Sequence, residues 1–189
     1  MTTNQDFVQE MMTLQNKIEE LVKQHLEGRD PRELQFKVNP DKWSALECMD
    51  HLNRYDDHYL PLVKKAMDRY PVKKGGFRYS WLGKKFVKMM EPNGTKTFKA
   101  LKDMNPSLSA VDPQTARRYL SNMDEMRTLI ADLERANLNK RCIPTTMSSF
   151  IVLKLGDIIH FLLMHKYRHT LQAVRALKEA EIGAAKIVQ

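Results

Sequence analysis

The segment that decides the fold has the sequence DIIHFLLMHKYRHTLQAVRALKEAE and covers residues 157–181. Its apolar side chains recur every three or four residues, the period of an amphipathic α-helix. With about 100° of rotation per residue, His165 and His169 fall about 40° apart on one face of the helical wheel. The apolar members of that face are Ile158, Phe161, Leu162 and Ala176. The sequence therefore predicts a helix, capped by Asp157, that turns two histidines toward the core.

These two histidines have two possible explanations. Side chains four residues apart on a helix lie about 5–6 Å apart at Cβ, close enough to share one metal ion. Burying a polar group without a partner costs roughly 1–3 kcal/mol, so the pair needs either a metal or hydrogen-bond partners in the core. The spacing alone leaves both open. His160 falls on nearly the opposite face and is predicted to meet solvent.

The composition is that of a soluble globular protein. The chain has 189 residues, of which 42% are hydrophobic and 29% charged, and we expect one domain over residues 1–189. No run approaches the roughly 18 apolar residues of a membrane span, and residues 1–6 lack a signal pattern. We therefore expect a cytoplasmic protein with no membrane partner. Cys48 and Cys142 form no CxxC motif and are expected to be reduced thiols.

Positive charge is concentrated in residues 72–102. The segment holds Lys73, Lys74, Arg78, Lys84, Lys85, Lys88, Lys96, Lys99 and Lys102 against one acidic residue, Glu91, and so accounts for the chain's net charge of +8. The aromatic residues among them are Phe77, Tyr79, Trp81, Phe86 and Phe98. This mixture is typical of a single-strand nucleic-acid platform, but it also suits a connector whose aromatics anchor it to the core. No nucleic-acid motif is present, so we favour the connector and expect no nucleic-acid partner.

Three further amphipathic helices are predicted, at residues 4–27, 44–70 and 112–136. Ser44 and Glu47 form a capping box that fixes the start of the second helix. Pro61 is expected to bend this helix, and the sequence Asp112-Pro113 to begin the third.

The connections between these helices predict the topology. Residues 71–111 form a long crossover with a short helix near residues 80–90, and residues 137–156 are predicted to be a second connector, in which Ile143, Phe150 and Leu155 cover something apolar. A crossover this long can carry the chain back along the molecule. The fold class is therefore all-α, a four-helix bundle with up-down-down-up order.

Three short motifs resemble the DinB-like (DinB/YfiT) superfamily of bacterial proteins. They are Lys42-Trp43-Ser44, Asp50-His51-Leu52 and His165-xxx-His169-xx-Gln172. The resemblance covers essentially the whole chain and implies a bundle in which His51, His165 and His169 bind a divalent metal. Taken alone, His51 could equally be a surface histidine near the helix start.

The implied site has a definite chemistry. Three neutral imidazoles suit zinc or nickel, and also iron, better than magnesium or calcium. Three protein ligands leave a position open, as in catalytic sites. Such an ion lowers the pKa of water to about 7 or stabilises a thiolate.

The residues near the implied site favour a transfer over a hydrolysis, although both reactions stay open. Glu47 is the only carboxylate within a turn of His51 on its face, and its capping role competes with a role as base. Characterised DinB-like proteins include thiol S-transferases, so the resemblance agrees. We expect a metal-dependent S-transferase or hydrolase acting on a small-molecule substrate, with a small thiol as the candidate cosubstrate.

Three other side chains have two interpretations each. Gln172 could orient a ligand imidazole or bind a backbone carbonyl. Tyr55 could donate into a pocket or fill the core. Arg168 is expected to form a salt bridge with a neighbouring helix, although it lies near the predicted site.

An alternative function remains open. The bundle could be a non-catalytic, stress-linked protein with a structural or vestigial metal site, acting as an interaction or dimerisation module, for instance as a homodimer.

Overall fold

The computed structural model describes residues 2–73, 75–92 and 99–187. Four long helices form the body of the molecule: α1 (Asn4–His25), α3 (Ala45–Arg69), α5 (Thr115–Asp132) and α6 (Leu155–Ile187). Two shorter helices accompany them, α2 (Pro31–Gln35) and α4 (Trp81–Met89), with 3-10 turns η1 (Lys102–Met104), η2 (Pro106–Leu108) and η3 (Leu133–Arg135). The predicted all-α bundle is confirmed.

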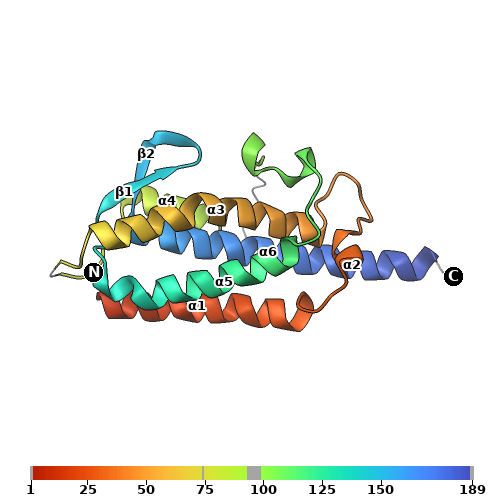
Figure 1. Ribbon diagram of the computed structural model, residues 1–189, viewed down its shortest axis with the longest axis horizontal. Helices are drawn as coiled ribbons and strands as arrows, with labels where there is room; N and C mark the ends of the chain where they lie inside the picture. The colour runs from red at the N-terminus through yellow and green to blue at the C-terminus, as the bar shows by residue number, and fades with distance from the viewer. Residues whose placement is uncertain (1, 74, 93–98, 188–189) are drawn as a thin grey trace.

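The four long helices run up-down-down-up, as predicted. Following the colours in Figure 1, α1 and α6 run in one direction, and α3 and α5 run in the other. The segment between α3 and α5 returns the chain along the bundle, so both middle helices start at the same end. Helix α6 then packs against α1, α3 and α4, and its C-terminal part extends beyond the bundle in Figure 1.

Capping boxes fix the starts of two helices. Ser44 Oγ accepts from the Glu47 N–H at 3.1 Å, and Glu47 Oε2 accepts from the Ser44 N–H at 2.7 Å, which confirms the predicted start of α3. Thr3 and Asp6 make the same exchange at α1. Pro61 lies inside α3, which continues past it to Arg69.

The third long helix is shorter than predicted. Asp112 and Pro113 form a turn ahead of α5, in which Asp112 Oδ1 accepts from the Gln114 N–H at 2.7 Å. The helix itself begins at Thr115, and its last turn changes to the 3-10 turn η3. The Asp-Pro signal marks the approach to the helix rather than its first residue, because the carboxylate is used in the turn.

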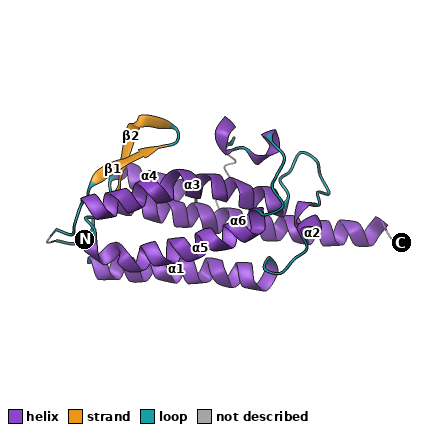
Figure 2. Cartoon of the chain, in the orientation of Figure 1, coloured by secondary structure: helices purple, strands orange, loops and turns teal. Residues whose placement is uncertain are grey.

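The prediction of a plain connector at residues 137–156 was wrong. This segment forms a β-hairpin of strands β1 (Arg141–Thr145) and β2 (Ser148–Lys154), which Figure 2 shows as the molecule's sheet. Ile143 and Leu155 are buried as expected, whereas Phe150 is 94% exposed. Pro144 lies in the ladder between two register irregularities. Because proline rarely occurs inside a strand, its presence made the strand pattern difficult to recognise in the sequence.

The predicted capping role of Asp157 was also wrong. Helix α6 begins two residues earlier, at Leu155, and Asp157 is fully buried. Its carboxylate accepts from the N–H of Ser80 at 3.1 Å and from the Ser80 hydroxyl at 2.6 Å. Ser80 Oγ in turn accepts from the Gly83 N–H. Asp157 therefore fixes the start of the predicted short helix, α4, against α6.

The aromatic residues of the basic segment mostly anchor it to the core. Phe77 is buried and packs edge-to-face on Phe7 at 4.7 Å between ring centroids, and Phe86 packs in the same way on Phe161 at 5.7 Å. Trp81 differs, since it is 77% exposed. Lys74, Lys96 and Phe98 lie outside the described residues. No helix in the described part of the chain is both long and apolar enough to cross a membrane.

Candidate metal centre

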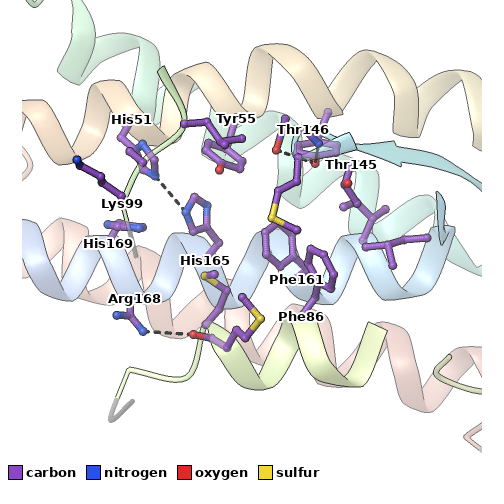
Figure 3. A pocket seen from close by; sticks show the side chains of 18 of the residues that line it. His51, Tyr55, Phe86, Lys99, Thr145, Thr146, Phe161, His165, Arg168 and His169 are labelled. Atoms are coloured by element: carbon purple, nitrogen blue, oxygen red, sulfur yellow. Dashed lines mark hydrogen bonds between the residues drawn. The ribbon is translucent and has the colours of Figure 1, made fainter. Parts of the chain in front are cut away.

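Three histidines from two helices meet inside the bundle. His51 lies on α3, and His165 and His169 lie on α6. One ring nitrogen from each lies within 4.8 Å of the other two, and the Nε2 atoms of His51 and His165 are 3.1 Å apart. Figure 3 shows the rings turned toward one another across the gap between the two helices. The structure thus brings together the three residues that the sequence singled out.

Hydrogen bonds orient two of the rings. His51 Nδ1 lies 2.6 Å from the carbonyl oxygen of Met104, and His169 Nδ1 lies 2.9 Å from Oε1 of Gln172. Both oxygens can only accept, so each Nδ1 carries the proton and each Nε2 keeps a free lone pair. These bonds leave the Nε2 atoms of His51 and His169 in the form that binds a metal.

The electrostatics keep the three rings neutral. Burial lowers the pKa of His51 to about 4 and is the main reason that the pKa of His169 falls to about 3. The pKa of His165 is lowered well below its ordinary value, first by burial and then by its two histidine neighbours. All three are therefore uncharged at neutral pH, each with one ring nitrogen free of a proton, as metal ligands must be.

The donor set fits a divalent metal. Zinc–nitrogen bonds of about 2.0–2.1 Å at tetrahedral angles place two ligand nitrogens about 3.3 Å apart, close to the 3.1 Å between His51 and His165. Three neutral imidazoles with no carboxylate form an all-nitrogen site, which suits zinc, nickel or iron. The cluster could therefore hold one such ion.

Aromatic rings surround the cluster. Measured between ring centroids, Trp43 lies 4.8 Å from His51 and Tyr55 lies 4.3 Å from His165. Phe161 stacks on His165 with a centroid distance of 5.6 Å and an interplanar angle of 6°. These contacts restrict ring rotation, so the imidazoles are held in place before any ligand arrives.

A cavity of about 280 Å³ opens beside the histidines. Figure 3 shows Phe86 from α4 and Thr145 and Thr146 from the hairpin on its far side. The lining also includes Tyr55, which is at the same time partly buried against the core, so both interpretations of this residue agree with the structure. No aspartate or glutamate is among the described residues that line it. Glu47 bonds instead to Ser44, Lys37 and Ser107.

The family comparison agrees with this geometry. The family model described as the DinB superfamily matches residues 16–173, a range that includes all three histidines. The chain belongs to the DinB superfamily. Neither the comparison with curated proteins nor that with solved structures gave a match.

In this DinB-superfamily chain, one expectation about a neighbouring residue needs correction. His160 was predicted to face solvent, but it is half-buried, with Nδ1 2.7 Å from the hydroxyl of Tyr79. The helical wheel could not foresee this, because the crossover covers that face. Arg168 donates to the carbonyl oxygens of Met89 and Glu91, at the end of α4, and its salt bridge with a neighbouring helix stays a prediction.

Of the two interpretations of Gln172, the structure shows the hydrogen bond to the His169 ring rather than one to a backbone carbonyl. Other parts of the candidate site were not predicted from the sequence. The role of the Met104 carbonyl could not be predicted from the sequence, because every residue has a backbone carbonyl. Thr146 reaches the cavity through the hairpin, where its N–H donates to the Tyr59 hydroxyl at 2.9 Å.

Proposed function

We propose that His51, His165 and His169 bind one divalent metal and that the protein uses it in an S-transfer reaction of a small thiol. The observation that supports this most is the meeting of three neutral imidazoles at the wall of a cavity large enough for a small organic molecule. A buried cluster without such access would suit a structural site better.

The ligand set points to zinc or nickel, with iron as the third candidate. When bound, such an ion supplies Lewis acidity that favours the thiolate form of a thiol substrate. Met104 and Gln172 hold two of the imidazoles in the required tautomer, and Trp43 and Phe161 keep the rings in place.

The lining favours transfer over hydrolysis. A hydrolase normally places a carboxylate base within reach of the attacking water, and the described lining contains none. A thiol that is already deprotonated needs no such base. Its sulfur forms a bond to an electrophilic carbon of the second substrate, and the leaving group departs with its electron pair.

Tyr55 is the candidate hydrogen-bond donor to that leaving group. Its ring lies beside His165 and lines the cavity. Burial raises the pKa of the Tyr55 hydroxyl, so the group keeps its proton at neutral pH and can donate a hydrogen bond to the charge that develops on the leaving group.

Elemental analysis joined to a thiol-transfer screen tests the proposal. Purified protein should contain close to one equivalent of metal, and a panel of small thiols with a chromogenic aryl chloride should reveal metal-dependent transfer. His165→Ala should remove both the metal and the activity while the protein stays folded. His58→Ala is the matched control, because His58 lies outside the cluster and packs on Tyr59.

Two outcomes would contradict the proposal. Unchanged metal content in His165→Ala would show that these histidines do not bind the metal. A sharp loss of thermal stability in His165→Ala, together with no activity of the wild type toward any thiol, would support the structural or interaction role instead.

A further inference from the structure

A second cavity lies on the other side of Trp43 and Gln172. It has a volume of about 150 Å³ and lies between the segment that leads into α3 and the outer half of α6. Its lining consists of Phe36, Lys37, Val38, Asn39, Lys42, Trp43, Gln172, Arg175, Ala176 and Glu179. Trp43 and Gln172 also line the first cavity, so they form the wall between the two.

The charges of this second cavity do not balance. Three cations, Lys37, Lys42 and Arg175, face one carboxylate, Glu179. Lys42 pairs with Glu179 at 3.3 Å, and Lys37 pairs with Glu47 at 3.0 Å. Arg175 has no ion pair or hydrogen bond within the part of the chain that the structure describes.

Arg175 is therefore the group that can take a ligand. A guanidinium presents up to five donors in a planar fork that matches a carboxylate or a tetrahedral oxyanion. The two neighbouring lysines are each paired with a carboxylate, so Arg175 is the cation of the lining whose charge has no ion-pair partner among the described residues. The cavity is smaller than the first, so it suits one charged group rather than an apolar body.

We propose that this cavity is a binding site for a small anion, a carboxylate or a sulfate-like oxyanion, held by Arg175. The site is separate from the metal centre and does not require a metal. Its wall is shared with that centre, because Gln172 accepts from His169 and Trp43 packs on His51. An anion bound there contacts the same two residues that shape the first cavity.

Tryptophan fluorescence can report on this site directly. The protein has two tryptophans, and Trp81 is 77% exposed, so Trp81→Phe leaves Trp43 as the only reporter without disturbing the core. Sulfate and acetate are titrated separately into this variant at constant ionic strength, with chloride as the replaced anion. The titrations are run on the metal-loaded protein and after chelation.

The expected result is a saturable change in Trp43 emission with at least one of the two anions, with and without metal. Arg175→Ala should weaken binding about tenfold or more, because it removes the charge-assisted donors. Lys178→Ala is the matched control, since Lys178 is exposed on the same helix and outside the cavity lining. It should change affinity by no more than about twofold.

Three results would overturn the site. The first is a response that does not saturate with either anion. The second is an equal loss in Arg175→Ala and Lys178→Ala, which would indicate a general charge effect. The third is binding only in the metal-loaded protein, which would place the anion at the histidines. Because the chelated protein is also tested, a failure of the metal proposal leaves this test intact.

Discussion

The proton on each Nδ1 atom determines what the histidine cluster can bind. His51 Nδ1–H donates a hydrogen bond to the backbone carbonyl of Met104, and His169 Nδ1–H donates one to the side-chain oxygen of Gln172. The first partner cannot be removed by substitution, but the second can. Gln172 is therefore the residue through which the orientation of one proposed ligand can be varied without changing the ligand itself.

Gln172→Ala should lower metal affinity about 10- to 100-fold, the usual effect of losing a partner that orients a ligand imidazole. Gln172→Glu keeps an acceptor oxygen at the same position and should retain most of the affinity. Competition against a chromogenic chelator measures both. If Gln172→Ala and Gln172→Glu lowered the metal affinity equally, loss of the hydrogen bond to His169 would not explain the decrease.

At the scale of the elements, one serine and one aspartate join the start of α4 to α6. Asp157 accepts two hydrogen bonds from Ser80 at the start of α4. The helices approach so closely there that a Cβ on Gly83 would lie 2.1 Å from Cγ of Asp157. This close approach also places Phe86 and Met89 in the wall of the first cavity.

Gly83→Ala should therefore destabilise the protein, because either the bonded Asp157 carboxylate or α4 must move. The expected loss is roughly 1–3 kcal/mol, as for other overpacked sites. Urea denaturation measures it. Lys84→Ala, at the exposed neighbouring position, should stay within about 0.5 kcal/mol. Equal stability of the two variants would show that the joint between the helices is loose.

At the scale of the whole molecule, four histidines with lowered pKa values lie in the interior or partly within it. Besides the cluster, burial lowers the pKa of His160 to about 4. In the unfolded chain each would titrate near its ordinary pKa of about 6.5. The folded protein thus excludes protons that the unfolded chain would bind.

Stability should therefore fall as the pH is lowered. Below about pH 6.5 the unfolded state binds more protons than the folded state, and the difference grows until the pH approaches 4, where the folded His51 and His160 also titrate. With a chelator present, Tm should be at least about 5 °C lower at pH 5 than at pH 7. His160→Gln should reduce this difference. A Tm that stayed constant over this range would contradict the lowered pKa values.

The fold and most of the proposed site could be predicted from particular residues. Apolar periodicity is a local property, so it identified the long helices, and the capping box at Ser44 located the start of α3. The spacing of His165 and His169 indicated which face of α6 they share. The three short motifs then added His51, although nothing local to residue 51 distinguishes it from a surface histidine.

Only the tertiary structure decided what these local patterns contact. The hairpin, the burial of His160 and the bond from Asp157 to α4 depend on segments far apart in the chain. The same is true of the core ion pair between Lys166 and Asp56, at 2.8 Å and almost fully buried. Periodicity shows which face of a helix is buried, but it does not identify the partner, because pairing depends on how the chain returns in space. The amino-acid sequence by itself therefore determined the helices and two of the three histidines, whereas folding decided the meeting of the three rings and the cavity beside them.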